Sequence, residues 1–155
     1  MKKIEILEKT VENGTNYKDI NVNATFGAAY FYSKEAGNEL INFAETIWNH
    51  DIDEIIENCR RFDIKEFTIS STFSELINTI AEFEKRGCKL QGLVEINSRY
   101  DDWNARFEGK PSTKERIPAF KLSLYNRGVH RDSFVVEIYT KFVHYLWYII
   151  VFQLV

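Results

Sequence analysis

The sequence lacks the short motifs that mark the common nucleotide-binding and hydrolytic sites. It contains neither a G-x-G-x-x-G nor a G-x-x-x-x-G-K-[ST] segment, which excludes the standard dinucleotide and P-loop phosphate sites. A G-x-S-x-G segment is also missing, and no Ser/His/Asp or Cys/His set can be assembled from the remaining residues. Whether the protein is an enzyme therefore stays open, and a non-enzymatic protein without a cofactor is the leading hypothesis.

Cysteine is scarce, and neither of the two cysteines stands at a spacing typical of a metal site. Cys59 and Cys88 belong to no C-x-x-C pair, and their neighbours in the sequence are apolar. We therefore expect two buried free thiols and no bound metal. We also expect no signal peptide, because charged residues interrupt the apolar ones in the opening M-K-K-I-E-I-L-E-K. These features predict a protein of the reducing cytoplasm.

The chain lacks the strong positive charge of most nucleic-acid-binding proteins. Its net charge is −3 over 155 residues, which argues against a nucleic-acid partner. Residues 1–110 hold 14 basic and 20 acidic side chains, whereas residues 111–155 hold 6 and 3. The basic side chains of the second part, such as Arg116 and Lys121, are either solvated or form a contact for an anion or a nucleic acid.

Hydrophobic periodicity predicts alternating helices and strands, in the order α-α-β-α-β-α-β-β. The predicted helices cover residues 4–13, 23–36, 51–61 and 72–85, and the predicted strands cover residues 39–47, 66–70, 90–96 and 117–124. We expect the first three strands to run parallel through right-handed crossovers and the fourth to return antiparallel beside the third. The predicted fold is therefore α/β, with a small, mostly parallel sheet of about four strands covered by helices.

Polar and aromatic residues gather in the loops that follow the predicted strands, where open parallel sheets bind ligands. Free backbone N–H groups at Ser71 and Thr72 could hold a phosphate or carboxylate, although a simple helix cap also explains these residues. The segment 97–103 could clamp an anion through its arginine and stack a ring on its aromatic residues, or be a solvated turn. The candidate ligand-binding residues are Ser71, Thr72, Asn97, Arg99, Tyr100, Asp101 and Trp103.

The C-terminal residues 126–155 form a hydrophobic extension to the single α/β domain predicted over residues 1–125. The stretch Phe142–Val155 carries no charge apart from a possible proton on His144, but a membrane-spanning helix needs about twenty apolar residues. Three interpretations stay open. The extension is a buried element of the same domain, a membrane anchor acting through Phe142–Val155, or a foreign tail from readthrough or a frameshift.

Four segments resemble a group of small uncharacterised α/β proteins, carrying a domain of unknown function, from mobile elements of gut Firmicutes. The segments are FGAAYFYSKEAGNELINF (26–43), IIENCRRFDIKEFTISSTFSELI (55–77), FEKRGCKLQGLVEINSRY (83–100) and ERIPAFKL (115–122). The resemblance covers residues 1–124 and implies no activity, cofactor or catalytic residue. Because the similar proteins end soon after the segment that matches IPAFKL, it also favours a foreign tail.

Two main functional hypotheses follow. The first is a non-enzymatic accessory or protein-interaction domain of a mobile element, with an unidentified protein partner. The alternative is a small-molecule or nucleotide-binding module, or a small enzyme, in which Ser71, Arg99 and Asp101 converge at the carboxyl ends of the strands. A third and weaker hypothesis is a domain tethered to a membrane through Phe142–Val155.

Overall fold

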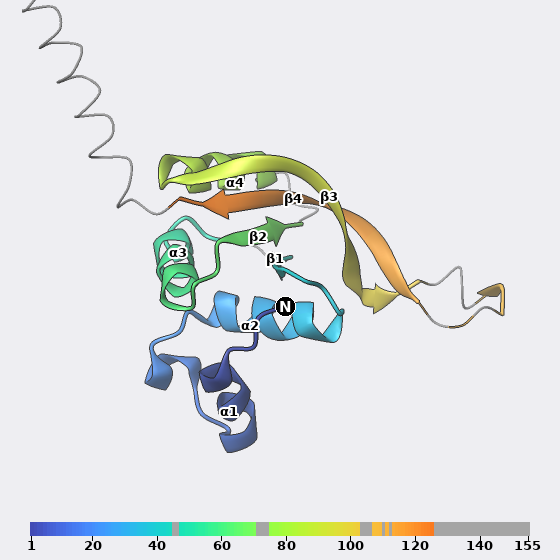
Figure 1. The fold of residues 1–155 in the computed structure, drawn as a ribbon, viewed down its shortest axis with the longest axis horizontal. Helices are drawn as coiled ribbons and strands as arrows, with labels where there is room; N and C mark the ends of the chain where they lie inside the picture. Colours follow the sequence, from blue (N-terminus) through green and yellow to red (C-terminus); the bar gives the residue numbers. More distant parts are fainter. Residues whose placement is uncertain (45–46, 71–74, 103–106, 110, 112, 126–155) are drawn as a thin grey trace, which may run out of the picture. The chain divides into compact units, whose positions relative to one another are not determined.

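Four α-helices, one 3₁₀-helix and four strands occur in residues 1–44, 47–70, 75–102, 107–109, 111 and 113–125, which the computed structural model describes (Figure 1). The helices are α1 (Glu5–Asn13), η1 (Tyr17–Ile20), α2 (Ala24–Glu35), α3 (Asp51–Arg61) and α4 (Leu76–Lys85). The strands are β1 (Ile41–Phe43), β2 (Glu66–Ile69), β3 (Cys88–Asp101) and β4 (Lys114–Leu124). The α/β class and the order of α-helices and strands are thereby confirmed.

The four strands form one mixed sheet in the order β1-β2-β4-β3. Only β1 and β2 are parallel neighbours, because β4 is antiparallel both to β2 and to β3. The predicted mostly parallel sheet is therefore wrong. β3 does run in the same direction as β1 and β2, but β4 returns from β3 as its hairpin partner and fills the position between β2 and β3. The first predicted strand is also shorter than expected, since β1 has three residues.

The β3–β4 hairpin is longer than predicted and includes residues expected in a loop. Asn97 pairs with Arg116 and Asp101 with Lys114, so the ladder continues through polar positions where the apolar alternation has ended. The register shifts between Leu90 and Gly92 and again between Asn97 and Asp101. Gly92 has a φ of 137°, which glycine adopts far more easily than other residues. Such bulges bend a hairpin, and β3 and β4 curve together in Figure 1.

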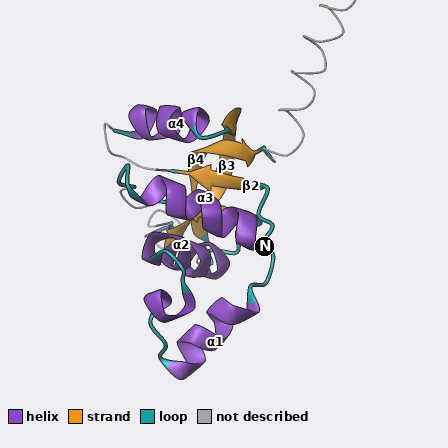
Figure 2. Cartoon of the chain, turned by 90° about the vertical axis from the view of Figure 1, so that its left-hand side faces the viewer, coloured by secondary structure: helices purple, strands orange, loops and turns teal. Residues whose placement is uncertain are grey.

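A chain of five phenylalanine rings connects the sheet to its helices. Phe43 of β1 lies 6.3 Å from Phe26 of α2, and Phe67 of β2 lies 5.5 Å from Phe43 and 5.3 Å from Phe83 of α4, measured between ring centroids. Phe62, just after α3, stacks on Phe26 at 5.7 Å. Because the register places Phe43 and Phe67 on the same face of the sheet, α2 and α4 pack against that face. Figure 2 shows α4, α3 and α2 following one another along the sheet.

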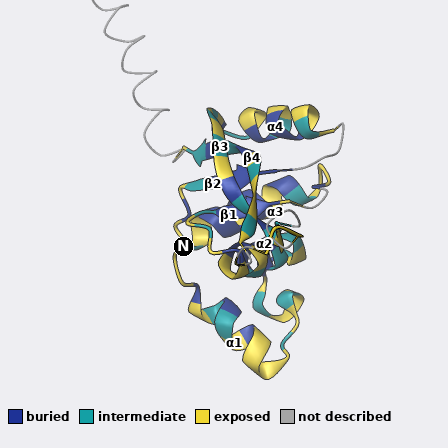
Figure 3. Ribbon diagram, turned by 90° about the vertical axis from the view of Figure 1, so that its right-hand side faces the viewer, coloured by how far each residue is buried: buried dark blue, intermediate teal, exposed yellow. Residues whose placement is uncertain are grey.

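Short-range hydrogen bonds explain where the helices begin and end. The side chain of Asn23 accepts the N–H of Phe26 at 3.1 Å and caps α2, as expected from the sequence. Gly14 ends α1 with a φ of 62°. Asp51 is the first residue of α3, and its carboxylate accepts a hydrogen bond from Asn23, as does that of Glu54. Exposed residues gather on the outer sides of α1 and α4 (Figure 3).

Both cysteines are buried free thiols, as predicted from their apolar neighbours. Burial raises the pKa of the Cys59 thiol and raises that of Cys88 to about 11. We therefore expect the native protein to be inert to a thiol reagent such as DTNB at mildly alkaline pH, because the thiolate is the reactive form. In concentrated guanidinium chloride, both thiols should react at once. A thiol that reacts rapidly in the native state would contradict this burial.

Glu8 joins α1 to α2 and makes the stability of the protein depend on pH. Its carboxylate accepts hydrogen bonds from Lys34 and Tyr30, each at 2.6 Å, which hold the pKa of Glu8 below its ordinary value of 4.5. The stabilisation is present above pH 4.5 and is lost as the pH falls through the lowered pKa. Urea unfolding midpoints of the wild type and Glu8→Gln should therefore differ at neutral pH and converge in acid. Glu12→Gln, an exposed change in the same helix, should follow the wild type throughout.

Residues Met1–Leu124 form one compact unit. The proposed extension, residues 126–155, lies outside the described residues, so the predicted division into domain and tail stays a prediction. Within the part of the chain that the structure describes, no helix is long and apolar enough to cross a membrane. If residues 126–155 are an appendage, residues 1–125 alone should melt cooperatively at the same temperature as the full chain. A large loss of melting temperature or aggregation of the short form would instead make the extension part of the core.

Candidate functional site

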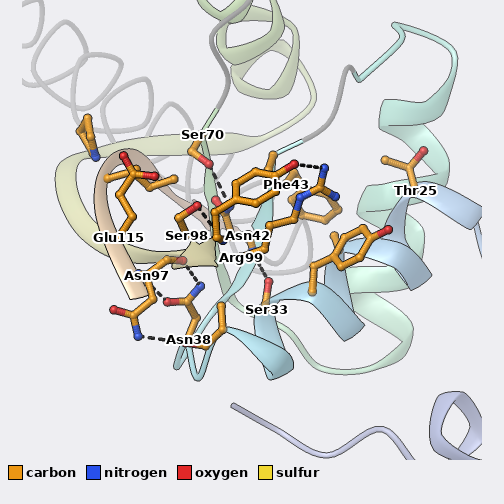
Figure 4. A pocket seen from close by; sticks show the side chains of 17 residues that line it. Thr25, Ser33, Asn38, Asn42, Phe43, Ser70, Asn97, Ser98, Arg99 and Glu115 are labelled. Carbon is orange, nitrogen blue, oxygen red and sulfur yellow. Dashed lines mark hydrogen bonds between the residues drawn. The ribbon is translucent and has the colours of Figure 1, made fainter. Parts of the chain in front are cut away.

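A cavity of about 470 Å³ lies between α2, the carboxyl ends of β1 and β2, and the far part of the β3–β4 hairpin (Figure 4). Apolar side chains form much of its wall, among them Ala29, Ala36, Phe43, Ile117 and Pro118. Because β1 and β2 run parallel, their carboxyl ends meet at one edge of the sheet. The cavity opens at this edge.

Asn42 of β1 organises the polar side of the cavity. Its backbone N–H donates to Ser33 Oγ at 2.7 Å, and its Nδ2 donates to Ser70 Oγ at 2.9 Å. Its Oδ1 accepts the hydroxyl of Thr68 at 3.0 Å. All four side chains are buried. Asn42 thereby ties α2, β1 and β2 together at the base of the cavity, and its amide is held in one orientation by partners on both sides.

An arginine and two tyrosines form the rim of the cavity. The guanidinium carbon of Arg99 lies 4.8 Å from the ring centroid of Tyr32 on α2 and 4.8 Å from that of Tyr100. Arg99 also donates to the hydroxyl of Tyr100 at 2.6 Å, a bond drawn in Figure 4. Such cation–π contacts stabilise a rim that comes from two distant parts of the sequence. Glu115 of β4 adds an exposed carboxylate to the lining.

A side-chain clamp holds the hairpin against the end of α2. Asn38 accepts the backbone N–H of Asn97 and donates to its carbonyl oxygen, both at 2.9 Å. Asn97 Nδ2 donates to the carbonyl of Ala36 at 2.9 Å, and Arg116 donates to Asn97 Oδ1 at 3.0 Å. The amide of Asn38 therefore occupies the backbone groups of β3 where a further strand would otherwise pair. The clamp closes one wall of the cavity and protects an edge of the sheet.

The structure brings three of the seven predicted site residues together. Asn97, Arg99 and Tyr100 line the cavity. Asp101 is not in the lining, and its carboxylate forms an ion pair with Lys114 at 3.2 Å within the hairpin. Ser71, Thr72 and Trp103 lie outside the described residues. The assignment of these residues to ligand binding stays a prediction.

Sequence reasoning missed several residues that shape the cavity. Asn42 had a readable signal, because it interrupts the apolar run Ile41-Asn42-Phe43 and a polar residue inside a buried strand needs partners. Ser33 stands on the buried face of α2, where a hydroxyl among apolar residues gives a similar signal. Nothing in the sequence indicates that Tyr32 belongs to the cavity, because Tyr32 meets Arg99 only through the curvature of the hairpin.

The described residues outside the cavity show neither a buried acid–base pair around a histidine at the start of α3 nor a metal site. His50 Nε2 lies 3.7 Å from Asp51 Oδ1, and the histidine side chain is 80% exposed, so the pair stands on the surface at the start of α3. Among the described residues, no group of three or more His, Cys, Asp or Glu side chains is arranged to hold a metal ion.

A family model described as a domain of unknown function (DUF7698) matches residues 25–124 of the chain. The matched stretch runs from the first turn of α2 to the last residue of β4 and contains every residue that lines the cavity. The resemblance to an uncharacterised domain is thereby confirmed over these residues. No curated protein and no solved structure is significantly similar to the chain. Similarity therefore leaves the function unknown, as the sequence predicted.

Proposed function

The chain belongs to the DUF7698 family, a domain of unknown function, and we propose that it is a small-molecule-binding module. The observation that supports this proposal is the cavity of about 470 Å³ at the carboxyl ends of β1 and β2. Ligand sites are typically concave, of about 300–1,000 Å³, and largely apolar with a few well-placed polar groups. The apolar wall around Phe43 and the polar side around Asn42 have this composition.

Preorganisation of the walls also supports ligand binding. The Asn42 bonds, the Asn38–Asn97 clamp and the contacts of Arg99 hold the side chains of the cavity before any ligand arrives. A preformed site binds more tightly because little side-chain freedom is lost on association.

A fragment screen by ligand-observed NMR tests the proposal. Ala44 is exposed and lines the cavity, so Ala44→Trp should fill the space without disturbing the core. We expect fragments to bind the wild type and to lose binding in Ala44→Trp. Val11→Trp is the matched control, because Val11 is 63% exposed on α1. The proposal fails if no fragment binds the wild type or if Ala44→Trp binds the same fragments equally well.

A second candidate function is a protein-interaction domain that serves as a cytoplasmic accessory protein of a mobile element. The supporting observation is the exposed rim, where the side chains of Tyr32 and Tyr100 are 40% and 57% exposed on either side of Arg99. Tyrosine and arginine are enriched among the residues that contribute most to protein–protein binding.

Affinity capture with two matched variants tests this second candidate. Tyr100→Ala should lose a protein partner that the wild type retains, because it removes a rim side chain without affecting the core. Trp48→Ala should keep the partner, since Trp48 is 62% exposed and is not part of the rim. The candidate fails if the purified protein captures no partner, or if Tyr100→Ala and Trp48→Ala behave alike.

Membrane association through Phe142–Val155 is a separate proposal. It is supported only by the apolar sequence of this stretch, which lies outside the described residues. Fractionation of cells that express the full chain or residues 1–125 tests it. Equal distribution of the two forms between the membrane and soluble fractions would exclude the proposal.

A further inference from the structure

Three buried serine hydroxyls line the cavity. Ser33 comes from α2, Ser70 follows β2 and Ser98 belongs to β3, and their side chains are only 2%, 6% and 7% exposed. Figure 4 shows all three among the side chains around the cavity. A buried hydroxyl normally has at least one hydrogen-bond partner, and it can donate one hydrogen bond in addition to those that it accepts.

Each of the three hydroxyl oxygens already accepts an N–H. Asn42 donates to Ser33 and Ser70 at 2.7 and 2.9 Å, and the backbone N–H of Tyr100 donates to Ser98 at 3.2 Å. A serine hydroxyl has one hydrogen to donate, and its direction adapts to the acceptors around it. Within the described part of the chain, none of these three hydrogens has an acceptor. The cavity therefore offers three hydroxyl donors on its buried side, apart from the exposed carboxylate of Glu115.

We infer that the cavity binds a ring compound that carries a carboxylate or carbonyl group, with hydroxyls of the set Ser33, Ser70 and Ser98 donating to its oxygen atoms. This inference rests on the proposed small-molecule function and names the ligand class. The rings of Phe43 and Tyr32 and the small residues of the wall suit the flat body of such a ligand.

The same donors disfavour an amine. An ammonium group has three N–H donors and no acceptor, so it leaves the serine hydrogens unmatched when it enters the cavity. A buried polar group that is left without a partner weakens binding. An amide should bind with an affinity between those of a carboxylate and an ammonium group, because it brings one carbonyl oxygen together with two N–H groups.

Three compounds of one shape test the ligand class on the full wild-type chain. Benzoate, benzamide and benzylamine differ only in the group attached to the ring, and dissociation constants come from NMR titration. Benzoate should bind about tenfold or more tightly than benzylamine, with benzamide between them, because hydrogen bonds to a charged acceptor are the strongest. Benzylamine binding as tightly as benzoate would overturn the inference.

Serine variants separate recognition by the hydroxyls from attraction to the charge of Arg99. Ser70→Ala and Ser98→Ala should each weaken benzoate binding about 10- to 100-fold, as expected for the loss of one hydrogen bond to a charged group. Ser123→Ala is the matched control, because Ser123 bonds Gln91 at 2.6 Å and does not line the cavity. Unchanged benzoate affinity in both cavity variants would overturn the inference.

The outcomes also distinguish this inference from the proposed function. If other fragments bind and lose binding in Ala44→Trp while benzoate shows no preference over benzylamine, the cavity is a ligand site but the ligand class is wrong. If neither these compounds nor any other fragment binds, both proposals fail. Because the wild-type ranking needs no variant, the inference can fail even if a serine variant does not fold.

Discussion

Replacing Phe67 by alanine is expected to lower the free energy of unfolding by about 3–5 kcal/mol, the range measured for large-to-small changes in protein cores. Phe67 is fully buried and contacts the rings of Phe43 and Phe83. It therefore joins the part of the core beneath α2 to the part beneath α4. Its removal leaves a cavity that rigid strands on both sides cannot close, and the aromatic contacts are lost in addition.

Urea denaturation followed by circular dichroism measures this effect. The unfolding midpoint should fall strongly, and the melting temperature should drop by roughly 10–20 °C. Ile77→Ala is the control, because Ile77 is 76% exposed on α4 and its truncation should change stability by less than about 0.5 kcal/mol. A loss for Phe67→Ala as small as that of the control would mean that the rings do not form the core described here.

Asn42→Ala is expected to give the second largest loss, about 2–4 kcal/mol, although it removes a polar side chain. The variant leaves Ser70 without the N–H that it accepts and Thr68 without its acceptor at 3.0 Å. Thr68 is only 1% exposed and does not line the cavity, so water does not readily replace Asn42 as its acceptor. Thr68 recovers part of the loss, because the carbonyl of Ile41 lies 3.4 Å from its hydroxyl.

A double variant identifies the source of this loss. If unsatisfied hydroxyls cause it, Asn42→Ala combined with Thr68→Val should be more stable than the sum of the two single effects predicts, because the orphaned hydroxyl is removed. Asn78→Ala is the control, since Asn78 lies on the exposed side of α4, where it donates to Glu75 at 2.8 Å. Strict additivity of Asn42→Ala and Thr68→Val would contradict a shared hydrogen-bond network.

Much of the candidate site could be located from the sequence, but its composition could not. The position at the carboxyl ends of the strands was predictable, because the polar residues after each apolar run collect there. Asn97, Arg99 and Tyr100 do line the cavity. Asp101 does not line it. The β3–β4 pairing continues past Asn97 and places Asp101 opposite Lys114, with which its carboxylate forms an ion pair. The sequence did not identify the buried serines or Asn42 as cavity residues, since their roles depend on hydrogen bonds to neighbours from other elements.

The sequence by itself determined the helices, the approximate strands and the α/β class. Asn23 begins α2 and Gly14 ends α1 through bonds within a few residues, so local chemistry suffices to place them. Periodic apolar residues likewise identify the buried side of α3, where Ile52, Ile55 and Ile56 are packed.

Only the tertiary structure decided the strand order, the length of the hairpin and the cavity. Hydrophobic alternation marks a strand but does not name its neighbour, so nothing local shows that β4 enters between β2 and β3. The pairing of Asn97 with Arg116 extends β3 past the end of its apolar pattern. The bend at Gly92 and the clamp from Asn38 then bring Arg99 to Tyr32. These contacts join residues far apart in the chain, and their energies exist only once the sheet has formed.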